Sequence, residues 1–115
     1  MESPRLNISK DNEKKLPSNL EAEQSLIGSV LVNNDIIDET SGIVNSHKFF
    51  DPAHRKIYEV IENLNNKGMI ANPITLKNYF ENENSLKEVG GVDYLVKLTR
   101  FSASIKQAID YSKII

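Results

Sequence analysis

The sequence has no cysteine and no long apolar run, and these two absences exclude several classes of protein. Without cysteine, disulfides, thiolate catalysis and cysteine-based zinc sites are all excluded. The apolar runs are only a few residues long, whereas a membrane-spanning helix needs about 20 apolar residues. The early charges are not followed by the apolar segment of a signal peptide. We therefore expect a soluble, cytoplasmic protein with no membrane partner.

Positive charge is not in excess either. The chain has 14 Lys and Arg against 16 Asp and Glu, a net charge of −2. Nucleic-acid binders usually concentrate positive charge on one face, because phosphate contacts supply most of their affinity. Here basic and acidic residues are interleaved, so we expect no strong binding of nucleic acid. A small helical DNA-binding or adaptor module remains the alternative hypothesis.

The glycines and histidines do not match a site of known chemistry. A phosphate-binding loop has the pattern G-x-x-x-x-G-K-[ST], but no Lys-Ser or Lys-Thr follows Gly90-Gly91. A metal site would need a third ligand beside His47 and His54, and Asp51 is the only local candidate. We therefore interpret His54 as a core residue and His47 as a loop residue, and expect no cofactor or metal on these residues.

The acidic and aromatic residues have ordinary structural interpretations, with one exception. Glu21 and Glu23 are two apart on a predicted helix and do not face each other, so we interpret them as solvated surface. Tyr58 and Phe80 are predicted core residues. Tyr94 follows a glycine turn, where side chains often stay accessible, and exposed tyrosines are enriched at interfaces. Tyr94 is therefore a candidate for partner contact. No strained nucleophile turn is present, which argues against a small helical enzyme.

Apolar residues recur at helical spacing along most of the chain, and no stretch alternates with the period of a strand. We expect a polar tail to end at Pro17 and the first helix to follow it, with Ser18 or Asn19 as its cap. Three further helix starts are predicted at Asp51-Pro52, Thr75 and Ser102–Ser104.

Glycine positions add detail to this helical pattern. Gly28 lies inside the first predicted helix, where glycine costs about 1 kcal/mol relative to alanine, so we infer that a neighbouring helix packs closely against it. Gly90-Gly91 predicts a reversal of the chain. The last apolar stripe stops at Ile115 without a cap, so we expect the native chain to continue. The predicted fold is all-α, a compact orthogonal bundle of about five to seven helices.

Four segments, taken in order, resemble one family. Leu20-Glu21-Ala22-Glu23-Gln24-Ser25-Leu26-Ile27-Gly28 is similar to the opening signature of bacterial replicative DNA helicases of the DnaB type. The other matching segments are Phe49-Phe50 with His54, Ile57 and Tyr58, then Thr75-Leu76, then Gly90-Gly91-Val92-Asp93-Tyr94-Leu95. They cover residues 17–115 in the family's order and spacing. The family's usual acid before the Thr-Leu helix is replaced by Asn72-Pro73, which should still start a helix.

The resemblance implies an N-terminal helical domain followed by a linker helix and a RecA-like motor. Residues 1–17 would be a disordered tail, 18–100 the helical head, and 101–115 the first arm of a hairpin through which N-terminal domains pair. The pairs would build a collar on a hexameric ring, where primase docks, and a helicase loader would assist the full-length protein. ATP and Mg²⁺ would be bound by the motor, which these residues do not include.

The resemblance also implies site residues. Tyr94 resembles a primase-contact position of the family. Glu21 could meet a basic partner, or could simply compensate the dipole of its helix. The apolar positions of the hairpin arm would meet a neighbouring subunit; they are Ile105, Ala108, Ile109 and Tyr111. We therefore predict a non-catalytic assembly and docking domain of a helicase that unwinds duplex DNA at the replication fork using ATP.

Overall fold

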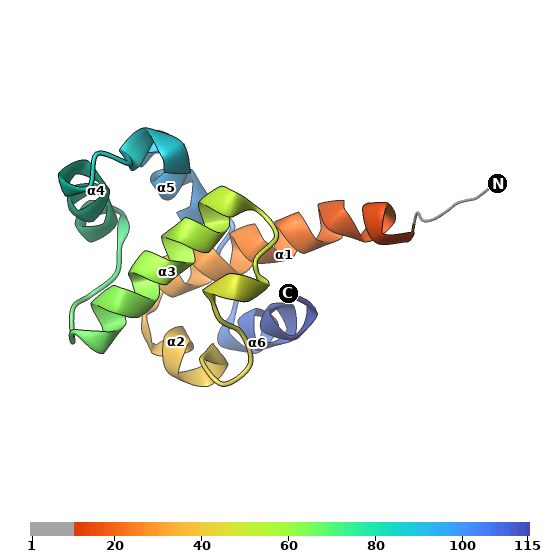
Figure 1. The fold of residues 1–115 in the computed structure, drawn as a ribbon. Coiled ribbons are helices and arrows are strands. Elements are labelled where there is room, and N and C mark those ends of the chain that lie inside the picture. The colour runs from red at the N-terminus through yellow and green to blue at the C-terminus, as the bar shows by residue number, and fades with distance from the viewer. Residues whose placement is uncertain (1–10) are drawn as a thin grey trace.

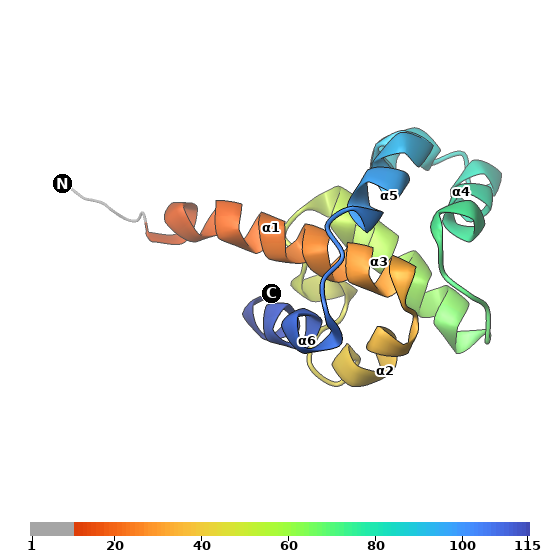
Figure 2. The ribbon, with the colours of Figure 1, turned by 180° about the vertical axis from the view of Figure 1, so that it is seen from behind.

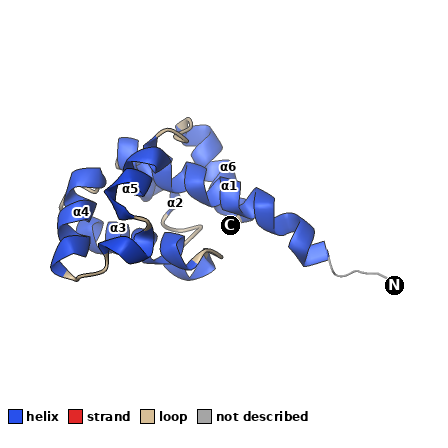
Figure 3. Cartoon of the chain, turned by 90° about the horizontal axis from the view of Figure 1, so that it is seen from above, coloured by secondary structure: helices blue, strands red, loops and turns tan. Residues whose placement is uncertain are grey.

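The computed structural model describes residues 11–115, with side chains from Leu20 onward, and this part of the chain is entirely helical apart from its loops (Figures 1 and 3). The elements are α1 (Asp11–Val32), α2 (Asp35–Thr40), η1 (Ser46–Lys48), α3 (Pro52–Asn66), α4 (Pro73–Asn82), η2 (Leu86–Val89), α5 (Gly91–Thr99) and α6 (Ile105–Ile114), where η marks a short 3-10 helix. The predicted all-α fold is confirmed. No helix within residues 11–115 has the length and apolar character needed to cross a membrane.

The start of α1 differs from the prediction. The helix begins at Asp11, so Pro17, Ser18 and Asn19 lie inside it and the predicted start and caps are wrong. The residues between Asp11 and Pro17 include Glu, two Lys and Leu, which favour helix. An acid at the first position also suits the helix dipole. Residues 1–10 of the predicted tail lie outside the described part of the chain.

The start of α3 confirms the prediction from Asp51-Pro52. The Asp51 carboxylate accepts hydrogen bonds from the backbone N–H groups of Ala53 at 2.7 Å and His54 at 3.2 Å. Pro52 occupies the first turn, where its missing N–H costs nothing. The helix therefore has a sharply defined beginning, which fixes the position of His54 at its third residue.

The start of α4 is shifted from the predicted cap. Asn72, not Thr75, is the N-cap, and its side-chain oxygen accepts from the N–H groups of Ile74 and Thr75. The Thr75 hydroxyl accepts from the Asn72 N–H in return, which completes a capping box. The resemblance had predicted that Asn72-Pro73 starts this helix, and that prediction is confirmed. Ser104 caps α6 in the same reciprocal way, with Gln107 as its partner.

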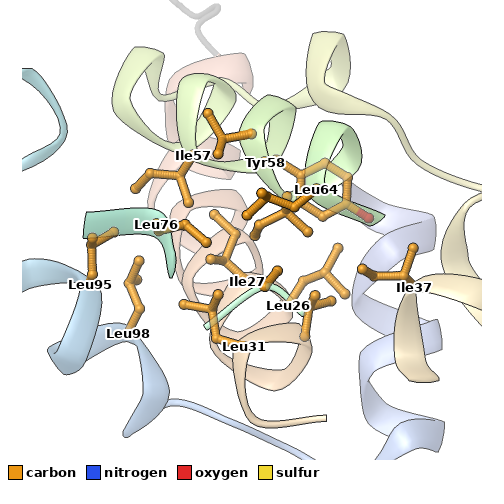
Figure 4. Close-up of a cluster of buried hydrophobic side chains, with 14 of the residues drawn as sticks. Leu26, Ile27, Leu31, Ile37, Ile57, Tyr58, Leu64, Leu76, Leu95 and Leu98 are labelled. Atoms are coloured by element: carbon orange, nitrogen blue, oxygen red, sulfur yellow. The ribbon is translucent and has the colours of Figure 1, made fainter. Parts of the chain in front are cut away.

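Helix α1 is the centre of the fold, and it packs against α2, α3, α5 and α6. Seen from behind, α5 lies on one side of α1 and α6 on the other, while the first turns of α1 extend beyond the other helices (Figure 2). The predicted core residues Tyr58 and Phe80 are each 1% exposed. Figure 4 shows the main cluster, in which the labelled residues are Leu26, Ile27, Leu31, Ile37, Ile57, Tyr58, Leu64, Leu76, Leu95 and Leu98.

Gly28 lies where the end of α5 and the α5–α6 linker cross α1. A Cβ atom at this position would lie 1.9 Å from the carbonyl oxygen of Leu98. Two serines of α1 hold the linker at the same place: Ser25 donates to the Phe101 carbonyl at 2.9 Å, and Ser29 accepts from the Ala103 N–H at 2.7 Å. The predicted close approach at Gly28 is confirmed, and it fixes the position of α5 along the axis of α1.

Candidate functional site

Tyr94 lies on the first turn of α5, directly after the glycine turn. Gly90 and Gly91 have φ of +94° and +76°, the left-handed conformation that glycine adopts readily. A Cβ atom at Gly90 would lie 2.8 Å from the Cβ of Tyr94, so the tyrosine packs over the bare glycine backbone. The predicted reversal of the chain is confirmed, and it leaves the Tyr94 side chain half-buried.

The surface beside Tyr94 is a shallow hollow of about 400 Å³. Its floor is mostly apolar and its rim carries charges of both signs. The residues that line it are Asp51, Ala53, Lys87, Glu88, Val89, Gly90 and Tyr94. The start of α3, the short helix η2 and the start of α5 therefore meet at one concave patch.

The hydroxyl of Tyr94 is directed into the fold. It lies 2.5 Å from Nε2 of His54, and it accepts a hydrogen bond from the Gln24 side chain at 3.3 Å. Burial is the main cause that raises the pKa of Tyr94 above its ordinary value; the Gln24 hydrogen bond opposes this shift, whereas Asp51 and Glu23 add to it. The phenol therefore stays protonated at neutral pH.

Glu23 is buried, at 1% exposed, so the interpretation of this residue as solvated surface is wrong. Its carboxylate accepts from the backbone N–H of Phe50 at 2.6 Å, from the N–H of Asp51 at 3.3 Å and from Nδ1 of His54 at 2.8 Å. These three donors compensate the loss of water around the carboxylate. A signal was present in the sequence, because Glu23 lies three and four residues before the buried Leu26 and Ile27 and therefore on the same helix face.

His54 lies between Glu23 and Tyr94 and forms a hydrogen bond with each of them. It is 1% exposed, which confirms the prediction of a core residue, and both ring nitrogens have hydrogen-bond partners. We call the series Glu23–His54–Tyr94 the Tyr94 relay; it links α1, α3 and α5. His47 is exposed on η1, and within residues 11–115 no group of three His, Cys, Asp or Glu is arranged to hold a metal ion.

Glu21 lies on the exposed side of α1, one turn before Gln24. Residues three apart on a helix are surface neighbours, and Gln24 reaches the Tyr94 hydroxyl. The two predicted partner-contact residues are therefore on the same side of the molecule, with Gln24 between them. Tyr94 is anchored from within, whereas Glu21 points to solvent.

The predicted subunit-interface residues on α6 divide into two groups. Ile105 is 43% exposed, and Ile109 and Tyr111 keep part of their surface accessible. Ala108 is fully buried, because α6 packs against α1 and α2 through this small side chain and Ser112. In this conformation Ala108 packs within the chain, and its predicted contact with a neighbouring subunit stays a prediction.

Comparison with known proteins gives a consistent result. Residues 15–115 match the family model described as the DnaB-like helicase N-terminal domain. The chain is 45% identical over 100 residues to the replicative DNA helicase DnaB of Rickettsia bellii, an alignment that covers 87% of this chain and 20% of that protein. It is 41% identical to the Rickettsia conorii protein of the same name, with 95% of this chain and 23% of that protein covered.

The fold has a solved counterpart. The N-terminal domain of DnaB helicase from Mycobacterium tuberculosis matches with a TM-score of 0.78 and 29% identity, over 83% of this chain and 69% of that one. The chain spans about a fifth of the length of the curated relatives that it matches. The family model, the relatives and the fold agree over nearly the whole chain: it belongs to the DnaB helicase family and forms that family's N-terminal domain.

Proposed function

We propose that this chain is the assembly and primase-docking domain of a hexameric replicative helicase, which as a whole protein unwinds duplex DNA at the replication fork using ATP. The observation that carries the docking part is Tyr94, a half-buried tyrosine anchored from within at the edge of a surface hollow. The sequence contains no phosphate-binding loop of the G-x-x-x-x-G-K-[ST] type. ATP and Mg²⁺ would therefore be bound by a motor domain outside these residues.

Tyr94 has the properties of an interface anchor. Tyrosine offers a large contact area with few rotatable bonds, so little conformational entropy is lost when a partner binds. Here the hydroxyl is already held by His54 and Gln24, which reduces that loss further. The adjacent hollow would accept a partner side chain beside the ring.

Glu21 supports the same surface by charge. Its exposed carboxylate lies one turn from Gln24, where it would attract a basic group on the partner. Exposed charges at the edge of an interface act mainly on the association rate and on specificity. We therefore propose that Glu21 raises the rate at which the partner associates, and that Tyr94 contributes most to the affinity.

Exposed apolar residues of α6 support the assembly part of the proposal. Ile105 and Ile114 are 43% and 55% exposed, and Ile109 and Tyr111 are partly accessible. We propose that exposed apolar residues of α6 meet a second subunit in the hexameric ring, and that a loader protein acts on the full-length helicase. A soluble cytoplasmic location is part of the same proposal.

The docking proposal is tested by calorimetry between this domain and the C-terminal domain of primase. Tyr94→Ala should weaken binding about tenfold or more, because it removes a central aromatic anchor. Tyr79→Ala is the matched control, since Tyr79 is a half-buried tyrosine on α4. Melting curves of both variants should show a folded domain.

Two results would contradict the proposal. Equal affinity of Tyr94→Ala and the wild-type domain would remove Tyr94 from the docking surface. Binding of duplex DNA at micromolar concentration, with a steep dependence on salt, would instead favour the alternative of a DNA-binding module.

A further inference from the structure

The hydrogen bonds of the Tyr94 relay do more than compensate the buried Glu23 carboxyl group, because they also fix the direction of the Tyr94 hydroxyl. Both carboxyl oxygens of Glu23 accept from backbone N–H groups, so we assign Nδ1 of His54, 2.8 Å from Oε1, as the third donor. In the neutral imidazole, Nε2 is then an acceptor, and the Tyr94 hydroxyl is the donor 2.5 Å away.

The hydroxyl of Tyr94 is thus fully engaged inside the fold. It donates to His54 and accepts from Gln24, and these partners come from two different helices. The planes of the His54 and Tyr94 rings differ by only 6°, which suits a hydrogen bond along the in-plane lone pair of Nε2. Rotation of the phenol toward solvent would break both hydrogen bonds and leave a buried acceptor without a donor.

The ring of Tyr94, by contrast, lines the hollow together with Ala53, Val89 and Gly90. We infer that Glu23 and His54 are positioning residues for docking: they hold the Tyr94 hydroxyl inside the fold, so that the partner meets the ring through an apolar side chain and not the hydroxyl. This inference rests on the proposed docking function, and it adds which part of Tyr94 is recognised and which residues orient it.

A double-mutant cycle tests the inference, with affinity for the primase C-terminal domain as the measurement. His54→Gln and Tyr94→Phe should each weaken binding about fivefold, because each removes the hydrogen bond that orients the ring. The double variant should be no weaker than either single variant, since both changes remove the same interaction. If the loss of affinity in the double variant equals the product of the two single losses, the hydroxyl acts separately from His54, and the inference is overturned.

His47→Gln is the matched control, because His47 is exposed on η1. It should leave the affinity unchanged. Tyr94→Ala separates the two proposals. If Tyr94→Ala weakens binding but folded His54→Gln does not, the positioning role is wrong and the docking function stands. If the wild-type domain does not bind primase, the docking function fails and the positioning role fails with it.

A second measurement does not require the variants to fold. The chain has only two histidines, so the imidazole nitrogens of His54 can be followed by ¹⁵N NMR with His47 as an internal reference. The free domain should show a protonated Nδ1 and a hydrogen-bonded Nε2. These signals should keep their positions when the primase domain is added, because Tyr94 continues to donate inward. Movement of Nε2 to a non-bonded position on binding would show that the partner takes the hydroxyl, and would overturn the inference.

Discussion

At the scale of single residues, Glu23 depends on its neighbours for hydrogen-bond donors. Three donors from two segments compensate the carboxylate: the N–H groups of Phe50 and Asp51 and the His54 ring. None of these donors belongs to α1, so the burial of Glu23 requires that α3 and the segment before it be in place. Glu23 therefore contributes to the docking of α3 on α1 as well as to the relay.

Glu23→Gln should lower the free energy of unfolding by about 2–4 kcal/mol. The amide of glutamine would place an N–H₂ group against one of three N–H donors, leaving buried donors without an acceptor. Urea unfolding followed by circular dichroism measures the change. Glu39→Gln, an exposed change of the same charge on α2, should stay within about 0.5 kcal/mol of wild type. Equal stability of the two variants would contradict a buried Glu23 carboxyl group held by three donors.

Alkaline titration should reveal two late-ionising tyrosines. Burial is the main cause that raises the pKa of Tyr58 and of Tyr94 above the ordinary value of 10.0. In the unfolded chain both phenols ionise near that value, so their contribution to stability is complete below it and is lost as pH rises through the folded-state pKa values. The absorbance of tyrosinate measures the ionisation, and Tyr94→Phe should remove one late-ionising group. Ionisation of all four tyrosines at the ordinary pH would contradict the burial.

At the scale of elements, the fold depends on a close crossing of α1 by α5 and its linker. Gly28 leaves room for the Leu98 carbonyl, while Ser25 and Ser29 hold the linker by hydrogen bonds. Because α5 also carries Tyr94, the position along α1 at which α5 crosses decides whether the Tyr94 hydroxyl reaches His54. A packing contact on one side of α1 is thereby connected to the candidate site.

Gly28→Ala should destabilise the domain by about 2 kcal/mol or more. The gain of about 1 kcal/mol from alanine's helix propensity is outweighed by a Cβ atom 1.9 Å from the Leu98 carbonyl oxygen, which forces α5 away from α1. Gly42→Ala is the matched control, because a Cβ there meets nothing within 4 Å. Thermal melting compares the two variants. A Gly28→Ala domain as stable as Gly42→Ala would show that the crossing is loose.

Helix starts show which elements are predictable from local sequence. Asp51-Pro52 begins α3 as predicted, because a capping acid followed by proline acts through backbone groups only two and three residues away. The start of α1 was predicted too late, since Pro17 was interpreted as the end of the tail while favourable helix formers precede it. Thr75 was predicted as the cap because threonine suits either position of a capping box. In the structure Asn72 is the N-cap, and Thr75 is the third helical residue that completes the box.

At the scale of the whole molecule, α6 packs against the fold along one side and leaves other apolar residues exposed. Ala108 and Ser112 are covered by α1 and α2, whereas Ile105 and Ile114 remain exposed. Ile105 and the partly accessible Ile109 lie one turn apart and form a small apolar stripe, which suits an association surface. In this chain the surface is small, so it should support only a weak contact.

The domain should therefore self-associate weakly, at high micromolar concentration. Sedimentation equilibrium measures the association, and Ile105→Asp should abolish it. Ile74→Asp, which changes an isoleucine on α4 that is 69% exposed, should leave it unaltered. A tight dimer at nanomolar concentration, or equal effects of the two substitutions, would contradict the assignment of the contact to α6.

The sequence by itself determined the all-α class, the cap and first turn of α3, the glycine turn before α5, and the family, because these follow from periodicity, local hydrogen bonds and motif order. Only the tertiary structure decided that Glu23 is buried, that Ala108 packs inward, and that the Tyr94 hydroxyl is held by His54. The physical reason is distance along the chain. Glu23 and His54 are 31 residues apart, and His54 and Tyr94 are 40 apart. Their hydrogen bonds exist only where three helices meet.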